Sequence, residues 1–253
     1  MHIRVTGNGP DLVLLHGWGL QGEVFAPLVE RLADHLTLHI VDLPGHGHSV
    51  DDTTPLRLPY VVNAIARSTP PAVWCGWSLG GLFALHAAAT LPGVRGLVMI
   101  AASARFQRGM DWPHGGEPAV LPQLAHELST RFAATLDRFL ALDLMAAKGP
   151  PAPLQALRER LLASGPPAPR ALTEGLALLQ STDLRGALPG LPCPSLWLAG
   201  QRDRLASPAA LQACAALAPH ARAVTVAHGG HAPFLGQPDE VAGLMKQFVA
   251  ALP

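Results

Sequence analysis

The chain has 253 residues, of which only 14% are charged, and its 18 lysines and arginines balance its 18 aspartates and glutamates, so the totals predict neither a nucleic-acid-binding surface nor an acidic tail. No run reaches the roughly 18 apolar residues of a membrane-spanning helix, and the first ten residues lack the apolar core of a signal peptide. We therefore expect one cytoplasmic α/β domain of ordinary size, a monomer with no nucleic-acid or membrane partner.

Short apolar runs alternate with glycine-rich loops and helical patterns over the first hundred residues. The pattern predicts strands at residues 3–6, 12–15, 36–41, 72–75 and 94–101. It predicts helices at residues 23–35, 56–68 and 82–90. Strand, loop and helix in this alternation are typical of a mostly parallel sheet that is covered by helices on both faces.

Strand patterns stop between residues 105 and 190. Helical spacing there predicts helices at residues 121–146, 154–163 and 171–180, separated by proline-rich connectors. Strands are expected again at 195–199 and 221–226, and helices at 208–217 and 238–251. We therefore expect a core of residues 1–104 and 191–253 and an inserted helical lid of residues 105–190.

The stretch Gly76-Trp77-Ser78-Leu79-Gly80-Gly81 lies where the fourth predicted strand meets an alanine-rich helix. Its G-x-S-x-G pattern is that of a nucleophile elbow, a strained turn that exposes a serine oxygen at the end of a strand. The flanking glycines have a steric reason, because a turn this tight leaves no room for a β-carbon. The alternative is that Ser78 is an ordinary turn residue without a catalytic role.

A serine hydroxyl is a poor nucleophile unless a base takes its proton and a third group holds the base. Asp203 and His231 follow predicted strands, as Ser78 does, and ligands of such sheets bind at the carboxyl ends of the strands. The order serine, aspartate, histidine is that of α/β-hydrolases. We therefore expect His231 to be the base and Asp203 to orient it.

Each of these assignments has an alternative. Asp203 lies between two arginines, so it could instead be a salt-bridged loop carboxylate. Asp183 would then be the rival orienter. However, Asp183 follows a helix of the lid and resembles a helix cap or a partner of Arg185. His228 and His231 together would be a metal site, but two histidines without a nearby carboxylate or thiolate make a weak one. We expect no metal and no cofactor.

Acyl transfer also needs donors for the oxyanion that forms on the substrate. The elbow supplies one from the backbone N–H of Leu79, and the loop His16-Gly17-Trp18 after the second strand is placed to supply another, for which we choose Trp18. The alternative is that His16 and Gly17 only shape a turn.

Three cysteines, Cys75, Cys193 and Cys214, are scattered through apolar surroundings. An odd number without regular spacing is typical of small core residues in a reducing compartment rather than of a disulfide framework.

Over its whole length the chain resembles the α/β-hydrolases and, more narrowly, the pimeloyl-acyl-carrier-protein methyl ester esterase (BioH) family of biotin synthesis. The elbow occurs in many hydrolases. The resemblance is carried by the stretches at residues 12–20, 41–45, 76–81, 138–142, 182–185 and 231–234. Tryptophan at positions 18 and 77 and the 138–142 stretch are the most discriminating of these features.

This resemblance implies hydrolysis of the methyl ester of an acylated acyl carrier protein to pimeloyl-carrier and methanol. It implies a triad of Ser78, Asp203 and His231, oxyanion donors at Trp18 and Leu79, and an acyl channel lined by Phe139, Leu140, Ala141, Leu142 and Asp143. The family meets its acidic carrier with lid arginines. Here Arg131, Arg138 and Arg158, with Lys148 and Arg160, are the candidates, although the proline-rich stretch 148–153 departs from the family.

Two other functions stay open at this point. A broad-specificity short-chain carboxylesterase or lactonase would use the same triad, because the fold does not determine the substrate. A ligand-binding protein that kept the fold and lost turnover is the other alternative, and the complete set of triad residues argues against it.

Overall fold

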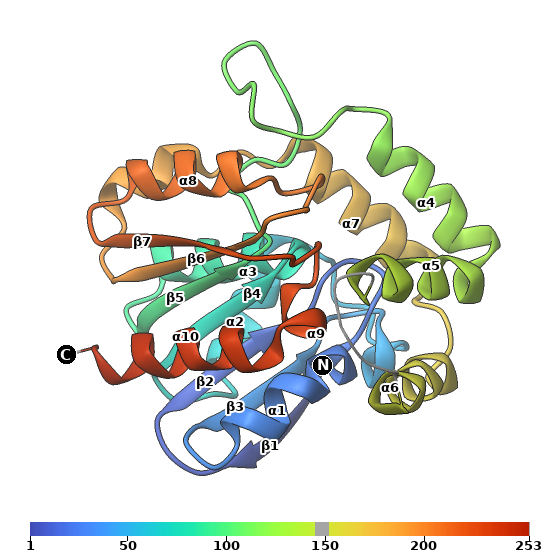
Figure 1. Ribbon diagram of the computed structural model, residues 1–253, viewed down its shortest axis with the longest axis horizontal. Coiled ribbons are helices and arrows are strands. Elements are labelled where there is room, and N and C mark those ends of the chain that lie inside the picture. Colours follow the sequence, from blue (N-terminus) through green and yellow to red (C-terminus); the bar gives the residue numbers. More distant parts are fainter. Residues whose placement is uncertain (145–151, 253) are drawn as a thin grey trace.

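The computed structural model describes residues 1–144 and 152–252, and the side chains at 143, 144 and 152–154 are outside this description. Seven strands form one sheet in the order β1-β3-β2-β4-β5-β6-β7 (Figure 1). Their bounds are β1 His2–Gly7, β2 Asp11–Leu15, β3 Thr37–Asp42, β4 Ala72–Trp77, β5 Val94–Ile100, β6 Ser195–Gly200 and β7 Ala221–Val226. β1 pairs antiparallel with β3, and all other neighbours are parallel.

Burial of the strands follows their place in the sheet. β4 and β6 are buried at every residue, as expected of strands covered on both faces, whereas the two outer strands β1 and β7 contain exposed positions. The apolar runs in the sequence therefore marked the centre of the sheet correctly. The carboxyl ends of the parallel strands meet at one edge, where Ser78, Asp203 and His231 follow β4, β6 and β7.

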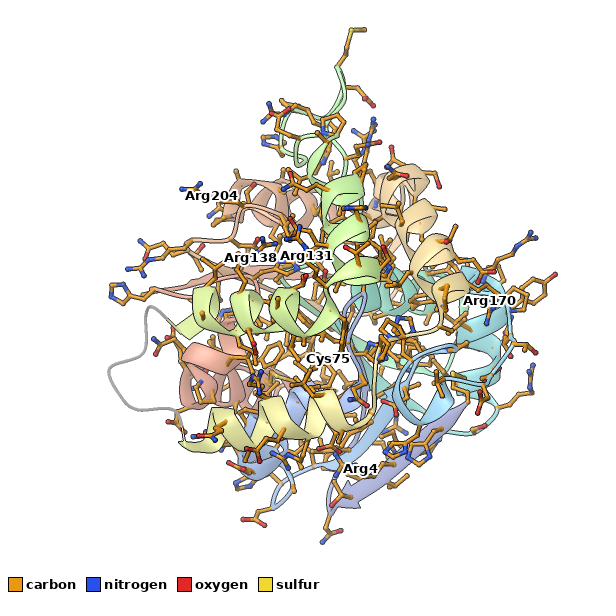
Figure 2. All side chains as sticks on the ribbon, turned by 90° about the vertical axis from the view of Figure 1, so that its right-hand side faces the viewer. Arg4, Cys75, Arg131, Arg138, Arg170 and Arg204 are labelled. Atoms are coloured by element: carbon orange, nitrogen blue, oxygen red, sulfur yellow. The ribbon has the colours of Figure 1, made fainter. Side chains whose placement is uncertain are left out.

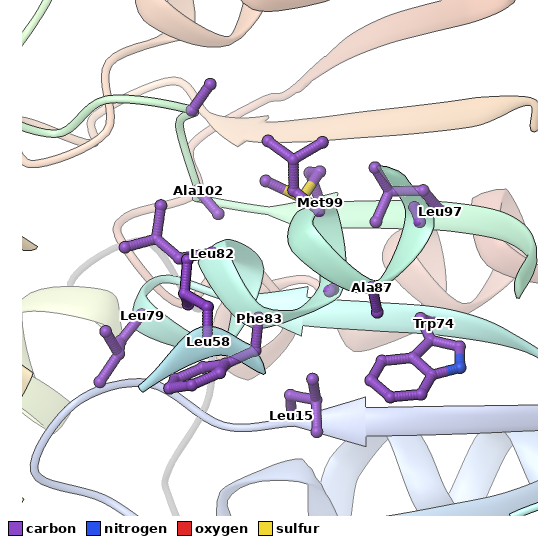
Figure 3. Packing of buried hydrophobic residues seen from close by; sticks show 14 of the residues in the cluster. Leu15, Leu58, Trp74, Leu79, Leu82, Phe83, Ala87, Leu97, Met99 and Ala102 are labelled. Carbon is purple, nitrogen blue, oxygen red and sulfur yellow. The ribbon is translucent and has the colours of Figure 1, made fainter. Parts of the chain in front are cut away.

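Helices cover both faces of the sheet and form two separate apolar clusters. One face carries α2 Leu58–Ala66, α3 Leu79–Thr90 and α8 Pro208–Leu217, and Figure 3 shows part of its packing around Phe83. The other face carries α1 Ala26–Leu32, α9 Pro233–Gly236 and α10 Pro238–Ala250. Alternate residues of β2 enter different clusters, Leu15 the first and Leu14 the second, because successive side chains point to opposite faces.

The helix expected at residues 23–35 is shorter than predicted. A 3₁₀ turn, η1 Gly22–Phe25, comes first, and α1 begins only at Ala26. The reason is Pro27, which has no N–H to donate and therefore fits the first turn of a helix but not its interior. Two further 3₁₀ turns are η2 Gly47–Ser49 and η3 Arg185–Gly190.

Between β5 and β6 the described chain is helical, with two isolated bridges in the loop before α4. The helices are α4 Val120–Thr130, α5 Phe132–Leu144, α6 Ala152–Ala163 and α7 Pro169–Ser181, and they gather beyond one end of the sheet (Figure 1). α7 packs against α3, α5 against α9, and α6 against η1. The segment therefore rests on both layers of helices.

The single helix predicted over residues 121–146 is wrong, because the chain breaks between α4 and α5. Arg131 leaves the helical conformation, with φ −143° and ψ 49°. Just before it, the hydroxyls of Ser129 and Thr130 both donate to the carbonyl of His126 and compete with the backbone for the last turn of α4. Residues 145 and 146 lie outside the described residues.

All three cysteines are buried and free, which confirms their prediction as core residues. Burial raises the pKa of the Cys75 thiol well above its ordinary value, so this thiol is not reactive. Within residues 1–144 and 152–252, every helix is too short or too polar to cross a membrane.

Candidate active site

Ser78 lies in the turn between β4 and α3 with a backbone that L-residues rarely adopt, φ 52° and ψ −121°. A β-carbon at Gly76 would lie 2.3 Å from the carbonyl oxygen of Gly80, and one at Gly80 would lie 2.1 Å from the carbonyl oxygen of Leu15. The structure thus confirms that both glycines are required sterically. The strand and the first turn of the helix are in contact only because these positions lack side chains.

The structure brings Ser78, His231 and Asp203 into one hydrogen-bonded chain. The Ser78 Oγ lies 2.9 Å from His231 Nε2, and His231 Nδ1 lies 2.9 Å from Asp203 Oδ2. With its proton on Nδ1, the imidazole donates to the carboxylate and leaves Nε2 to accept the Ser78 hydroxyl proton. The arrangement has the geometry in which a serine hydroxyl is activated as a nucleophile.

Backbone groups hold the Asp203 carboxylate in place from its other side. Asp203 Oδ1 accepts hydrogen bonds from the N–H groups of Leu205, at 2.8 Å, and Ala206, at 3.1 Å, and its side chain is fully buried. Asp203 is therefore not the exposed, salt-bridged carboxylate of the alternative reading. The rival, Asp183, instead pairs with Arg105 and Arg185.

A metal at His231 does not fit this geometry, since both of its ring nitrogens already contact triad partners. His228 lies 3.5 Å from an Arg202 guanidinium nitrogen and is exposed. In the described part of the chain, no three His, Cys, Asp or Glu side chains are grouped so as to hold a metal ion.

The loop after β2 lies directly against the elbow. A β-carbon at Gly17 would be 3.2 Å from the Ser78 Cβ and 2.9 Å from the Trp77 ring, so only glycine allows this approach. Leu79 is the first residue of α3, and its N–H therefore has no acceptor within the helix. The backbone N–H groups of Trp18 and Leu79 thus belong to the two segments that flank Ser78, and their role as oxyanion donors remains our proposal.

His16 fixes the shape of this loop, as the alternative reading of His16 and Gly17 expected, although the sequence did not reveal its hydrogen-bond partners. Its Nε2 accepts from the Leu43 N–H at 2.9 Å, and its Nδ1 donates to the Gly17 carbonyl at 2.8 Å. Burial lowers the pKa of His16 and, with His16 itself as a neighbour, lowers the pKa of His46 to about 3. Both rings are therefore neutral at pH 7, and the neutral His16 ring can accept from one N–H and donate to one carbonyl.

Two tryptophan side chains connect the site to distant parts of the chain through hydrogen bonds. The Trp18 Nε1 donates to the Leu172 carbonyl of α7 at 3.1 Å, and the Trp77 Nε1 donates to the carbonyl of His231 at 2.7 Å. Trp77 is buried and also packs against His231, Phe139 and Phe234. Trp77, the residue before Ser78, therefore holds the backbone of His231.

We expect Trp77→Phe to lower kcat about fivefold to tenfold with little change in KM, because it removes one buried hydrogen bond worth about 1 kcal/mol from the residue that carries the base. Steady-state kinetics on an activated ester measure this. Trp74→Phe is the matched control: Trp74 is equally buried on the same strand but packs in the cluster away from His231. Equal losses of kcat in both variants would contradict the positioning role.

An apolar chamber with an empty volume of about 650 Å³ adjoins Ser78 and His231. Its wall is almost wholly carbon, and most of it comes from the 105–190 segment: Phe106, Leu121, Leu124, Leu128, Phe132, Thr135, Leu136, Phe139 and Leu179. The spacing of three and four residues along α4 and α5 places these side chains on one face of each helix. That spacing was visible in the sequence, but it did not show that the face borders the nucleophile.

Of the residues 139–142 that were expected to line an acyl channel and whose side chains are described, only Phe139 lines the chamber. Leu140 is buried in the cluster beneath the helix, Ala141 is exposed, and Leu142 is 62% exposed and lines a second, outer cavity. The side chain of Asp143 is outside the described residues. Consecutive residues of an α-helix point about 100° apart, so five in a row cannot face one chamber.

Two of the three arginines expected to contact a carrier protein are ion-paired within the helical segment. Arg138 of α5 pairs with Glu127 of α4, and Arg158 of α6 pairs with Asp137 of α5. Arg160 lies 3.7 Å from Glu23, and Arg131 is exposed. Lys148 lies outside the described residues.

A family model described as "Alpha/beta hydrolase family" matches residues 12–244 of this chain. The chain belongs to the alpha/beta hydrolases. Its similarity to curated members covers its full length: a pimeloyl-acyl-carrier-protein methyl ester esterase of Stenotrophomonas maltophilia is 71% identical over 100% of this chain and 97% of that protein. The enzyme of the same name from Xanthomonas oryzae pv. oryzae is 63% identical over 100% of both chains. This hydrolase therefore falls within that esterase family.

Solved structures of other hydrolases share its fold. An esterase from Exiguobacterium antarcticum superposes with a TM-score of 0.86 at 19% identity and covers 99% of this chain and 95% of its own. An esterase from a Rhodococcus species gives a TM-score of 0.81 at 27% identity, covering 99% and 94% of the two chains. The seven-stranded, mostly parallel sheet with helices on both faces is thus the alpha/beta hydrolase fold, as expected.

Proposed function

We propose that this hydrolase is a serine carboxylesterase that cleaves the methyl ester of pimeloyl-acyl-carrier-protein in biotin synthesis. The observation that carries the proposal is the hydrogen-bonded chain Ser78–His231–Asp203 in a protein 71% identical, over its full length, to an esterase of that name. The reaction yields the pimeloyl-carrier acid and methanol.

In the first half of the reaction, Ser78 Oγ attacks the ester carbonyl while His231 Nε2 takes its proton. Asp203 stabilises the resulting imidazolium through Nδ1, and the N–H groups of Leu79 and Trp18 stabilise the oxyanion. The tetrahedral intermediate collapses when His231 returns the proton to the methoxy oxygen. Methanol leaves, and the pimeloyl group remains esterified to Ser78.

In the second half, a water molecule takes the place of methanol beside His231 Nε2. His231 removes a proton from this water, which attacks the acyl-enzyme carbonyl, and the second tetrahedral intermediate passes through the same oxyanion donors. His231 then returns the proton to Ser78 Oγ. The product is a carboxylate, and the serine is restored.

The apolar chamber suits both the methylene chain and the uncharged ester group of the substrate. A polymethylene chain gains free energy from burial against leucine and phenylalanine side chains, about 0.8 kcal/mol for each CH₂ group. An ionised carboxylate is costly in the same surroundings. The chamber therefore favours the neutral methyl ester over the product acid, which assists release of the product.

For the remaining features we propose the roles expected from the family. The 105–190 segment serves as a lid, since its apolar side chains form most of the chamber wall. The acylated carrier protein is the partner, with Arg131 as the candidate that forms no ion pair with the described side chains. The buried, free cysteines suit a reducing compartment, and we place the enzyme in the cytoplasm as a monomer.

The proposal is tested by measuring methanol release from pimeloyl-carrier methyl ester and p-nitrophenol release from p-nitrophenyl esters of short acids. We expect the carrier-bound ester to have the higher kcat/KM, and the gene to restore growth of a biotin-requiring strain that lacks its own esterase. Faster hydrolysis of the p-nitrophenyl esters with no complementation would instead indicate the broad-specificity esterase or lactonase. No hydrolysis of any ester would support a ligand-binding role.

A further inference from the structure

Two arginines flank the triad aspartate on the loop after β6. Arg202 and Arg204 are exposed, whereas Asp203 between them is buried, because adjacent residues of this loop point in different directions. Neither guanidinium pairs with a carboxylate of the described residues, and the one polar side-chain contact is that of Arg202 with His228 Nδ1, at 3.5 Å. Arg138 and Arg158, in contrast, are already paired with acidic side chains.

Both arginines line a second cavity, which we call the vestibule. It has an empty volume of about 1300 Å³, part of it open to solvent, and five of its residues also line the inner chamber: Leu124, Thr135, Phe139, Leu205 and His231. The vestibule therefore adjoins the chamber along the side of the catalytic histidine. Its own charged side chains are Arg138, Arg202, Arg204 and the fully buried Asp203.

The wall of the vestibule therefore combines basic side chains with apolar ones. Figure 2 shows Arg138 and Arg204 on the face of the molecule that is turned towards the viewer, and both belong to the wall of this cavity. Asp203 does not neutralise them at the surface, since its oxygens bind His231 and the backbone N–H groups of Leu205 and Ala206. The Glu127 carboxylate pairs with Arg138 and accepts a hydrogen bond from the Gln123 amide. Arg202 and Arg204 thus supply two guanidinium groups that no carboxylate of residues 1–142 or 155–252 pairs with.

We propose that Arg202 and Arg204 form a subsite for the phosphodiester of the phosphopantetheine arm on which a carrier protein holds its acyl group. The inference rests on the proposed function, because it assumes a substrate with an ester at one end and this arm at the other. Guanidinium groups bind phosphate oxygens with charge-assisted, often paired hydrogen bonds. The methylene chain then occupies the chamber, and the arm runs out through the vestibule past Phe139 and Leu205.

The position of this subsite differs from the one that the resemblance implies, in which arginines of the 105–190 segment meet the carrier. The proline-rich stretch 148–153 contains no arginine, and the arginines of α5 and α6 pair with Glu127, Asp137 and Glu23. Arg202 and Arg204, which pair with no carboxylate of the described residues, belong instead to the core, on the loop that also orients His231. Recognition of the arm and alignment of the triad then depend on the same short loop.

Two thioesters without any carrier protein test the subsite: methyl pimeloyl-phosphopantetheine and methyl pimeloyl-pantetheine. We expect the wild-type enzyme to favour the phosphorylated form about fivefold to tenfold in kcat/KM, mainly through KM, and to lose this preference as salt is raised from about 0.02 M to 0.5 M. In the double variant Arg202→Gln/Arg204→Gln the ratio falls to about one. Because the ratio compares two substrates of one variant, a general loss of activity cancels.

Arg95→Gln is the matched control, an exposed arginine at the start of β5, away from the carboxyl ends of the strands, and it should keep the wild-type ratio. A ratio of one in the wild type, or a preference that survives the double substitution, would overturn the phosphate subsite. So would a double variant that is impaired only on carrier-bound substrate, since the arginines would then contact the surface of the carrier.

A second measurement separates the subsite from the proposed function. Phosphopantetheine and pantetheine are compared as competitive inhibitors of p-nitrophenyl butyrate hydrolysis. We expect the phosphorylated compound to inhibit the wild-type enzyme several times more strongly and both to inhibit the double variant equally. Stronger inhibition by phosphopantetheine without turnover of pimeloyl-carrier methyl ester would retain the subsite and refute the substrate, and equal inhibition of the wild type would refute the subsite.

Discussion

Ser78→Ala is expected to lower kcat for every ester substrate by about 10⁴-fold to 10⁶-fold, because no other group can form the acyl-enzyme. The Ser78 Oγ contacts His231 Nε2, and alanine removes that oxygen alone. Substrate binding should persist, since the chamber wall and the oxyanion donors are unchanged. The activity is measured as methanol release from pimeloyl-carrier methyl ester and as p-nitrophenol release from an activated ester.

The same variant should fold normally. Alanine is as strained as serine at φ 52°, and the hydroxyl bonds only to the imidazole, so we expect a change in unfolding free energy below about 1 kcal/mol. An organophosphonate that labels the wild type once should not label Ser78→Ala, as read by mass spectrometry. Activity above about 1% of the wild type in a folded, unlabelled variant would show that Ser78 is not the nucleophile.

Gly80→Ala is expected to destabilise the enzyme by several kcal/mol and to abolish activity even where folded protein is recovered. Its β-carbon would lie 2.1 Å from the Leu15 carbonyl oxygen and 2.7 Å from that of His16, and backbone atoms cannot rotate away as a side chain can. α3 would have to move off β2. That movement displaces the Leu79 N–H and the loop that carries Trp18 relative to Ser78.

Gly243→Ala is the matched control for this substitution. Gly243 lies within α10, and no atom lies within 4 Å of the β-carbon that alanine would add. Alanine at an open helical position stabilises by about 0.5–1 kcal/mol. Urea unfolding of both variants measures the contrast. A Gly80→Ala protein as stable and as active as the wild type would mean that the elbow does not need this close contact.

Much of the site could be predicted from the sequence because its signals are local. The elbow depends on neighbouring residues, two glycines around a serine between a strand and a helix, and the structure shows why each glycine is required. Asp203 and His231 were found as polar residues at strand ends, and parallel strands bring their carboxyl ends to one edge of the sheet. Pattern and topology together were sufficient to place the three side chains in contact.

The helical segment of residues 105–190 was predicted less well. Its helices are amphipathic, and the spacing of their apolar residues is the same whether the apolar face packs in the core or lines a cavity. Phe139 lines the chamber, whereas its neighbour Leu140 packs beneath the helix. The break at Arg131 carries no glycine or proline to mark it. Local propensity is too weak to predict such features when packing against distant elements decides them.

By itself, the sequence determined the order of the strands and of most helices, the elbow, and the three polar residues Ser78, Asp203 and His231 at strand ends, since these follow from periodicity, from the conformations open to glycine and from chain order. Only the tertiary structure decided which side chains surround Ser78 and that Trp77 holds His231 across 154 residues of sequence. It also decided that Arg138 pairs with a carboxylate of the described residues whereas Arg202 and Arg204 do not. Such contacts join residues far apart in the chain. They depend on how whole elements pack, and no local pattern of residues encodes that packing.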